Sequence, residues 1–269
     1  MRRFLLLLVL ALAPPVPGAE SIILATTTST QDSGLLDVLT PAFTAETGIE
    51  VKVIAVGTGA ALKMGGRGDA DAVLVHAPEA EQVYVDRGDL IDGTAVMHNE
   101  FVIVGPAEDP ARARSESGAI AAMAAIARHG GFVSRGDDSG THKKELELWH
   151  AAGVDPATVP RREETGQGMG STLIIASENQ GYTLTDTSTW RVLRPKLELT
   201  VIFSGDPPLF NPYHAHVINP AKHPRVKHDS ARKFVDFLVS ENGRALIAGY
   251  RVDDGKPLFT PHQHTAPAP

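Results

Sequence analysis

Three segments of this chain share one order of residues: an apolar run typical of a buried strand, a few hydroxyl or glycine residues, and the start of a helix. The segments span residues 21–30, 51–59 and 131–142. A helix that begins directly after a strand leaves its first backbone N–H groups unpaired, and its dipole adds partial positive charge at the same end. Three such junctions favour an α/β fold whose strand–helix turns can hold a small anion.

The rest of the chain continues this alternation. We predict strands at 21–26, 51–56, 72–75, 97–104, 131–134, 181–184, 199–203 and 214–218. We predict helices at 32–46, 59–65, 79–87, 117–128, 140–151, 169–178, 230–239 and 241–249. The first of these helices has the apolar spacing of an amphipathic helix, with Leu35, Leu36, Leu39 and Phe43 on one face. Alternating elements of this kind predict parallel or mixed sheets covered by helices.

Two apolar runs, 100–106 and 199–206, each lead into a polar or proline-rich stretch and are candidates for crossings between two domains. If the chain leaves the first domain near the first run and returns near the second, that domain is discontinuous. We therefore expect a lobe 1 formed by 20–105 and 204–269 and a lobe 2 formed by 106–203. A ligand bound between the lobes would meet junction loops from both sides.

The first 19 residues have the pattern of a signal peptide. A basic start, Met1-Arg2-Arg3, precedes the apolar run Phe4–Ala13, and the small residues that follow offer cleavage after Gly18 or Ala19. The apolar run is too short to anchor the mature protein in a bilayer. We expect export to the periplasm, without membrane insertion.

Composition excludes several classes of protein. The chain has no cysteine, which rules out disulfides, thiol catalysis and thiolate metal sites. Its net charge is −7, whereas a nucleic-acid binder is normally basic. For an anion binder, a negative total charge means that attraction must come from a few well-placed donors and not from a broad positive surface.

Five consecutive hydroxyl residues, Thr26–Thr30, stand where the first predicted strand meets its helix. Hydroxyl groups can surround an anion with hydrogen-bond donors without adding charge. The candidates for ligand contact are Thr26, Thr27, Thr28 and Ser29. The alternative is that one or two hydroxyls only cap the helix, since Ser29 and Asp32 have a spacing similar to a capping box.

The second junction, Gly57-Thr58-Gly59, offers less. Gly57 would permit close approach of the backbone to a ligand, and Thr58 would donate a hydroxyl. The alternative is that the two glycines only turn the chain from strand to helix.

The third junction contains the cation that is best suited to an oxyanion, Arg135. Its guanidinium is a planar, permanently charged fork that matches oxyanion oxygens. Ser139, Gly140 and Thr141 would add hydroxyl and backbone donors at the start of the following helix. The segment is therefore the most specific part of the predicted anion site.

Two carboxylates, Asp137 and Asp138, stand within the same junction and would repel an anion if they faced it. We expect them to orient Arg135 or to cap the helix. The run Gly136–Gly140 is superficially similar to the nucleophile loop of a serine protease, but the spacing is wrong and an all-β protease would not alternate strands with helices. An exported hydrolase that uses Ser139, or a histidine with a nearby aspartate, is the alternative of a different class.

A glycine-rich loop, 165–172, precedes a further apolar helix. It lacks the lysine of a nucleotide-binding P-loop, so ATP is not the expected ligand. Gly168 and Met169 could offer backbone donors, or the segment could be a plain loop.

Two histidine pairs have spacings that could hold a metal: His214 with His216, and His262 with His264. No third ligand is evident for either pair, so ordinary surface or core histidines are favoured.

Taken together, these motifs resemble the tungstate-binding proteins of bacterial ABC importers, the periplasmic component of the Tup-type system. The matching segments are Ala25–Leu36, Val53–Gly59, Gly68–Pro78, Ser134–His142, Gly166–Gly170 and Tyr182–Asp186. They cover nearly all of the mature chain in the same order. His98 departs from the pattern, because relatives often have Tyr there, and this affects the expected hinge more than the ligand site.

The resemblance implies a two-lobed type II solute-binding fold, with two mixed sheets flanked by helices and the ligand in the cleft between the lobes. It implies that the protein binds tungstate, or molybdate, and delivers it to an ABC transporter permease in the inner membrane. It also implies a monomer that is not an enzyme and has no cofactor. The implied ligand contacts are Thr26, Thr27, Thr28, Ser29, Gly57, Thr58, Arg135, Ser139, Gly140, Thr141, Gly168 and Met169. Sulfate and phosphate are the alternative ligands.

Overall fold

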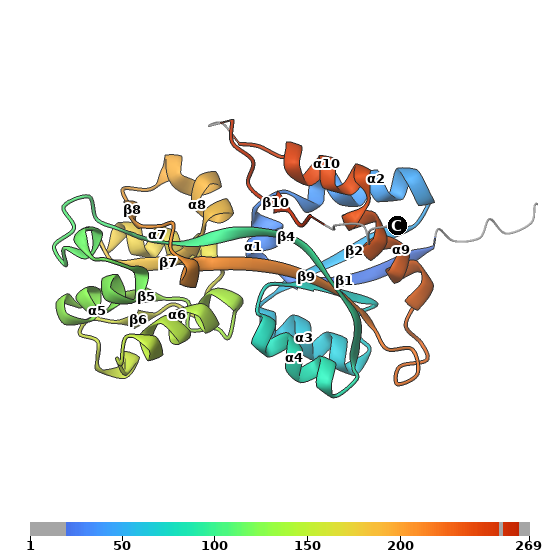
Figure 1. The fold of residues 1–269 in the computed structure, drawn as a ribbon, viewed down its shortest axis with the longest axis horizontal. Coiled ribbons are helices and arrows are strands. Elements are labelled where there is room, and N and C mark those ends of the chain that lie inside the picture. Colours follow the sequence, from blue (N-terminus) through green and yellow to red (C-terminus); the bar gives the residue numbers. More distant parts are fainter. Residues whose placement is uncertain (1–19, 253–254, 264–269) are drawn as a thin grey trace, which may run out of the picture.

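The computed structural model describes residues 20–252 and 255–263. Its elements form two groups that lie side by side along the long axis of the molecule, here called lobe 1 and lobe 2, and two long strands, β4 and β9, run through both (Figure 1). The predicted signal peptide and His264 lie outside the described residues. Within those residues, no helix has the length and apolar character that crossing a bilayer requires.

Lobe 1 is built around parallel strands followed by helices, and it is completed by elements from the end of the chain. Its elements are β1 (Ser21–Thr27), α1 (Thr28–Asp32), α2 (Leu36–Thr47), β2 (Glu50–Val56), α3 (Thr58–Arg67), β3 (Ala72–Val75), α4 (Pro78–Asp86), α9 (His228–Val239), α10 (Glu241–Gly249) and β10 (Thr260–Pro261). Strand β1 pairs in parallel with both β2 and β3. The carboxyl ends of these strands therefore lie at one edge of the sheet, where α1, α3 and α4 begin.

Lobe 2 is smaller. Its elements are α5 (Ala119–His129), β5 (Val133–Ser134), α6 (Gly140–Ala151), β6 (Glu163–Glu164), α7 (Met169–Glu178), β7 (Thr183–Asp186), α8 (Thr187–Leu193) and β8 (Thr200–Phe203). Short 3-10 helices within the described residues lie at 113–115, 156–158, 194–196 and 207–209. Strands β7 and β8 pair with the end of β4, and β5 pairs with β6.

The two long strands connect the lobes. Strand β4 (Leu90–Gly105) pairs antiparallel with β9 (Phe210–Ile218) as far as Glu100, and from Phe101 onward it pairs with β7 and β8. Because β4 takes part in both lobes, the two expected mixed sheets join into one eight-stranded sheet, in the order β10-β4-β9-β3-β1-β2 with β7 and β8 on β4. The mixed α/β class is confirmed.

The boundaries at residues 105 and 204 stay a prediction. Phe101, Ile103 and Leu209 pack together in the core of lobe 2. This packing favours crossing points near residues 100 and 210, a few residues outside the range 106–203.

Most predicted elements are present, but some bounds were wrong. The helix predicted at 32–46 is α2 and begins only at Leu36, because the short helix α1 occupies Thr28–Asp32 and Gly34, with a positive φ of 77°, separates the two. Strand β4 begins at Leu90 and not at 97, and β9 begins at Phe210 and not at 214. Helix α8 was not predicted.

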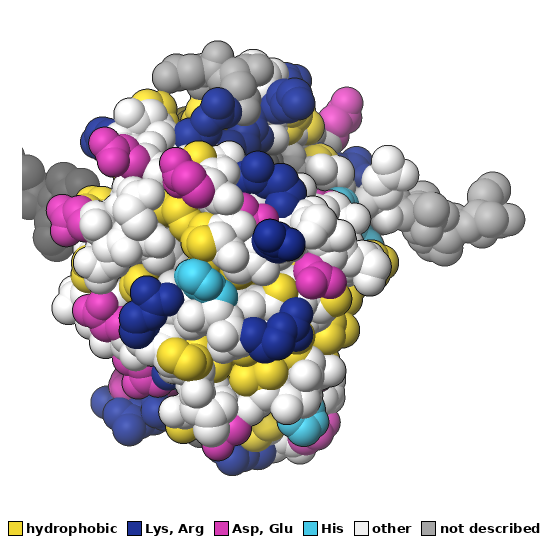
Figure 2. Space-filling model, turned by 90° about the vertical axis from the view of Figure 1, so that its left-hand side faces the viewer, with side chains coloured by type: hydrophobic (Ala, Val, Ile, Leu, Met, Phe, Trp, Pro, Cys, Tyr) yellow, Lys and Arg dark blue, Asp and Glu magenta, His cyan; other side chains and the backbone are white. Residues whose placement is uncertain are grey.

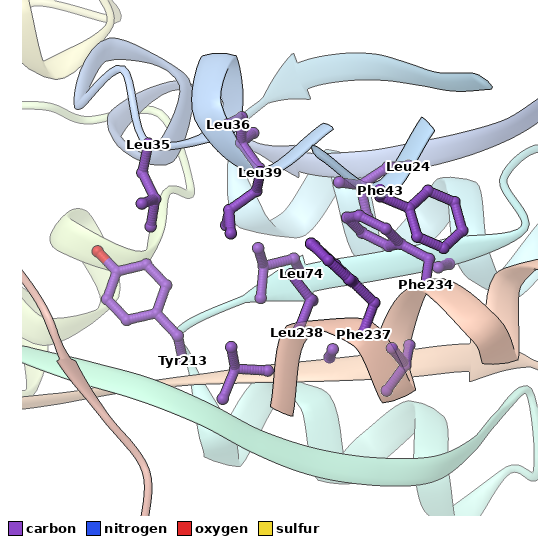
Figure 3. Close-up of a cluster of buried hydrophobic side chains, with 14 of the residues drawn as sticks. Leu24, Leu35, Leu36, Leu39, Phe43, Leu74, Tyr213, Phe234, Phe237 and Leu238 are labelled. Carbon is purple, nitrogen blue, oxygen red and sulfur yellow. The ribbon is translucent and has the colours of Figure 1, made fainter. Parts of the chain in front are cut away.

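The core of lobe 1 lies between α2, α9 and the sheet (Figure 3). The apolar face predicted from the sequence is buried, with Leu36, Leu39 and Phe43 at 1% exposure or less. Phe43 contacts Phe234 edge-on, with ring centroids 5.1 Å apart. Burial of one such side chain stabilises the fold by about 1.5–3 kcal/mol. This core fixes the direction of β1 and hence the position of the loop that follows it.

Candidate functional site

The hydroxyl run at the end of β1 forms a small network at the start of α1. Thr27, not Ser29, is the N-cap: its Oγ1 accepts a hydrogen bond from the Thr30 backbone N–H at 3.2 Å. The same oxygen lies 3.1 Å from Ser29 Oγ and 2.7 Å from Thr30 Oγ1. The predicted capping box of Ser29 and Asp32 is therefore wrong, while Thr27 and Ser29 are both buried at the junction.

Thr26 is directed elsewhere. Its Oγ1 donates to the backbone carbonyl of Leu74 in β3 at 2.7 Å, and its side chain is fully buried. A hydroxyl has one proton, so this bond leaves Thr26 no donor for a ligand. The structure ties Thr26 to the sheet and does not bring it to the other candidates.

The second junction touches lobe 2 directly. The backbone N–H of Gly59 donates to the carbonyl of Asp138 at 3.3 Å. A Cβ added to Gly57 would lie 3.3 Å from the carbonyl oxygen of Asp137, and one added to Gly59 would lie 1.8 Å from Asp138 Oδ2. Both glycines therefore permit contact between the lobes. Thr58, between them, is fully buried, and its Oγ1 has no hydrogen-bond partner within the described residues.

Arg135 reaches from lobe 2 toward lobe 1. Its Nη2 lies 3.3 Å from Thr28 Oγ1 and 2.5 Å from Asp137 Oδ2. The residue is 2% exposed, and its Nε has no partner within the part of the chain that is described. As expected, Asp137 orients the guanidinium, and it also accepts from the Ser139 backbone N–H at 3.2 Å.

Helix α6 begins at the same place. Ser139 is its N-cap and accepts from the His142 backbone N–H at 3.1 Å. Gly140 and Thr141 form the first turn, where backbone N–H groups have no partner in the helix. The Thr141 side chain is 2% exposed, and its Oγ1 is also without a partner within the described ranges. The Asp138 carboxylate pairs with Lys143.

The glycine-rich loop contributes the start of α7. Gly168 is the N-cap, and a Cβ added to it would lie 3.8 Å from Thr28 Oγ1. Met169 is fully buried in a core cluster of lobe 2, so that only its backbone N–H is available to a ligand. Burial raises the pKa of Asp32, at the end of α1. The positive charge of Arg135 lowers this pKa, and the negative charge of Asp186 raises it.

The candidates thus converge from both lobes. Helices α1, α3, α6 and α7 all begin there, and each N-terminus carries partial positive charge. Six buried side-chain polar atoms in the described residues lack a hydrogen-bond partner, and three of them belong to this point: Thr58 Oγ1, Arg135 Nε and Thr141 Oγ1. Buried polar groups are normally paired. Three unpaired ones near four helix starts make this junction the candidate site for a hydrogen-bond acceptor such as an oxyanion.

Sequence reasoning missed one neighbour, His76. Its Nε2 lies 3.5 Å from Ser29 Oγ and its Nδ1 lies 2.9 Å from Asn211 Oδ1. The ring stacks on Tyr213, with centroids 4.7 Å apart. Burial lowers its pKa, more than the nearby Asp186, the Asn211 hydrogen bond and Glu81 raise it. The signal was available, because His76 follows β3 and precedes α4 in the same strand–loop–helix order.

The histidine pair on β9 has a different partner. His214 Nδ1 lies 2.8 Å and His216 Nε2 lies 3.2 Å from one oxygen of Glu81, which is nearly buried. Across the described residues, no group of three or more His, Asp or Glu side chains is arranged to hold a metal ion. The pair therefore ties α4 to β9.

Charge on the surface is mixed. Figure 2 shows the end of lobe 2, where basic and acidic side chains are interspersed. This face offers no broad cationic surface.

Comparison with known proteins places these features in a family context. The chain matches the PBP superfamily domain over residues 14–242. It is 46% identical over 246 residues to the tungstate-binding protein TupA of Peptoclostridium acidaminophilum. The aligned region covers 90% of this chain and 86% of that protein.

Two solved structures are similar in both sequence and fold. The tungstate ABC transporter structure from Geobacter sulfurreducens has 46% identity and a TM-score of 0.78, covering 86% of this chain and 99% of that chain. The tungstate-binding protein TupA from Desulfovibrio alaskensis G20 has 45% identity and a TM-score of 0.78, covering 91% and 100%.

Proposed function

The chain belongs to the PBP superfamily and, within it, to the TupA family of tungstate-binding proteins, and from this premise we propose that it binds tungstate between its lobes and delivers it to an ABC transporter permease. The observation that carries the proposal is the set of unpaired buried atoms contributed by both lobes: Thr58 Oγ1, Arg135 Nε and Thr141 Oγ1. Tungstate is a tetrahedral dianion without a proton at neutral pH, and its four oxygens accept hydrogen bonds.

The donors suffice for tight binding. A hydrogen bond to a charged group contributes about 1.5–3 kcal/mol net. Five to seven such bonds, reduced by the cost of ordering and desolvation, correspond to roughly nanomolar affinity. Arg135 supplies the one formal positive charge, and Thr27, Thr28, Ser29, Ser139 and the backbone at Gly57, Gly140, Gly168 and Met169 are proposed to supply neutral donors.

The choice among oxyanions follows from protons and size. Phosphate carries a proton near neutral pH and needs an acceptor, which a site made of donors lacks, so phosphate is disfavoured. Sulfate has the same charge as tungstate and is smaller, so it must be rejected by the width of the cavity. Molybdate matches tungstate in charge and shape, and it is the second candidate ligand.

Binding and delivery are linked through closure. Donors on two lobes can reach one anion only when the lobes meet, so the ligand stabilises the closed form by its additional contacts. We propose that the permease recognises this closed form, and that the protein acts as a monomer in the periplasm after removal of the signal peptide.

Catalysis is the weaker alternative. Ser139 Oγ accepts from the His142 backbone, and the His142 ring accepts from the Asp138 backbone at 3.1 Å, so neither is arranged as a nucleophile with its base. Two of the relatives named above are tungstate-binding proteins. Incubation with ester, phosphate-ester and peptide substrates tests the hydrolase alternative, which predicts turnover.

The test of the proposed function is calorimetry of the mature protein against four anions at pH 7.5. We expect tight, one-to-one binding of tungstate, comparable or weaker binding of molybdate, and much weaker binding of sulfate and phosphate. Equal affinity for phosphate and tungstate would contradict the proposal.

A further inference from the structure

Four buried polar side chains form one hydrogen-bonded series that crosses between the lobes and ends beside the candidate site. Asp186 caps α8 in lobe 2, Asn99 and Asn211 lie on the two crossing strands, and His76 follows β3 in lobe 1. Asn99 Nδ2 lies 3.3 Å from Asp186 Oδ1, and Asn211 Nδ2 lies 2.7 Å from Asn99 Oδ1. His76 Nδ1 lies 2.9 Å from Asn211 Oδ1. All four residues are 6% exposed or less.

The series has a defined direction because an ionised carboxylate only accepts hydrogen bonds. Asp186 therefore accepts a hydrogen bond from the Asn99 amide N–H, and the Asn99 oxygen accepts one from the Asn211 amide N–H. The oxygen of Asn211 is left to accept from Nδ1 of His76. A neutral His76 consequently carries its proton on Nδ1 and presents a lone pair at Nε2.

That lone pair faces Ser29, whose Oγ lies 3.5 Å from Nε2. Beside a neutral ring, Nε2 is an acceptor that competes with an anion for the Ser29 hydroxyl proton, as does Thr27 Oγ1 at 3.1 Å. Beside a doubly protonated ring, Nε2–H donates to Ser29 Oγ, and the hydroxyl proton can turn toward the anion. Protonation of His76 thus removes one competing acceptor and favours Ser29 as a donor to the site.

We propose that His76 is a positioning residue of the oxyanion site, which takes up one proton from solvent at Nε2 when the anion binds and thereby favours Ser29 as a donor. The inference rests on the proposed function. Its balance is simple: one N–H bond forms, no bond of the anion changes, and the pair of tungstate and imidazolium carries a net charge of −1.

The groups around the ring support this coupling. Burial opposes the charged ring and lowers its pKa, while the carboxylates of Asp186 and Glu81 favour it and Arg135 opposes it. Tyr213 stacks on the ring but adds no charge, because burial keeps its pKa well above 10.0. A dianion beside Ser29 would add an attraction that the free protein lacks. The free protein therefore holds His76 neutral, and the bound anion favours the protonated ring.

The ring also has a route to solvent. A cavity of about 640 Å³ between α4, α6 and the start of β9 is lined by His76 together with Gly140, Lys143 and Asn211. Solvent in this cavity therefore reaches the ring, although His76 is only 4% exposed.

The experiment is calorimetric titration with sodium tungstate between pH 6.5 and 8.5, in pairs of buffers with different ionisation enthalpies. We expect the wild-type protein to take up as much as one proton per tungstate, and its affinity to fall by up to tenfold for each unit of rising pH. His76→Gln places an amide N–H beside Ser29 and cannot titrate, so it should bind with no proton uptake and a flat pH profile. The matched control, His98→Gln, removes a histidine at the crossing outside the series and should keep the wild-type uptake.

The outcomes are separable. Wild-type protein that does not bind tungstate contradicts the proposed function, whereas tight binding without proton uptake, or uptake that persists in His76→Gln, overturns this inference alone. If His76→Gln does not fold, the ¹⁵N shift of the His76 Nε2 atom in the wild-type protein decides the question. It should move from the lone-pair range to the protonated range when tungstate is added, and an unchanged shift would overturn the inference.

Discussion

The Nη2 atom of Arg135, in lobe 2, lies 3.3 Å from the Oγ1 atom of Thr28, in lobe 1. Residues more than a hundred positions apart thus meet across the two lobes, although one belongs to the hydroxyl run after β1 and the other to the loop before α6. The guanidinium is 2% exposed and keeps a bond to Asp137. A buried cation that bridges the lobes in this way is what the proposed closure around an anion requires.

Replacement of Arg135 should weaken tungstate binding the most. Arg135→Gln removes the charge and is expected to reduce the affinity at least tenfold, and Arg135→Lys should recover only part of the loss because an ammonium lacks the planar fork. Calorimetry at fixed salt measures both variants. Wild-type affinity in Arg135→Gln would place the anion elsewhere.

The unpaired hydroxyls offer a cleaner comparison. Thr58→Val and Thr141→Val each remove a hydroxyl that has no partner within the described residues, so we expect a loss of about 1.5–3 kcal/mol in tungstate binding and little change in the free energy of unfolding. Affinity is measured by calorimetry and stability by urea denaturation without ligand.

Thr26→Val is the matched control for these variants. Its hydroxyl donates to Leu74, so its loss should lower the free energy of unfolding by about 1 kcal/mol and leave tungstate affinity unchanged. The assignment would be refuted if Thr26→Val weakened tungstate binding while Thr58→Val and Thr141→Val lowered only the free energy of unfolding.

One methyl group at Gly59 should hinder closure. In Gly59→Ala a Cβ would lie 1.8 Å from Asp138 Oδ2, so this carboxylate must turn aside before the lobes can meet, and we expect weaker tungstate binding and smaller compaction in X-ray scattering. Stability without ligand should not fall, because Ala is favoured over Gly within a helix. Gly249→Ala is the control, since it meets nothing within 4 Å. Equal compaction in both variants would count against closure at this contact.

The Glu81 cluster should contribute to stability at neutral pH and lose that contribution in acid. Burial tends to raise the pKa of Glu81, but its bonds to His214 and His216 outweigh burial and hold the pKa below 4.5. A lowered pKa means that the folded state is favoured above pH 4.5 and that this advantage is lost as the pH falls through the folded-state pKa.

Glu81→Gln tests this assignment. It should lower the free energy of unfolding at pH 7 by about 1–3 kcal/mol, and the difference from the wild type should shrink below pH 4.5. Glu79→Gln changes an exposed residue of the same helix and should have little effect. A difference between wild type and Glu81→Gln that does not vary with pH would show that the carboxylate charge is not what matters.

Local patterns in the sequence predicted the strand–helix junctions well, because capping and apolar spacing involve neighbouring residues. Gly57 and Gly168 are the N-caps of α3 and α7, and Arg135 in the loop before α6 reaches Thr28 across the lobes. What could not be predicted depends on pairs far apart in the chain. In the sequence Thr26 looks equivalent to Thr27, but its hydroxyl donates a hydrogen bond to the carbonyl of Leu74. The role of His76 depends on its contact with Asn211, 135 positions away.

The most direct test is an anomalous difference map, recorded at the tungsten absorption edge, from crystals of the mature protein grown with tungstate. We predict one strong peak between the lobes, with tungstate oxygens within hydrogen-bond distance of Thr58 Oγ1, Arg135 Nε and Thr141 Oγ1. A peak outside this junction, or one that touches donors of a single lobe only, would contradict the account.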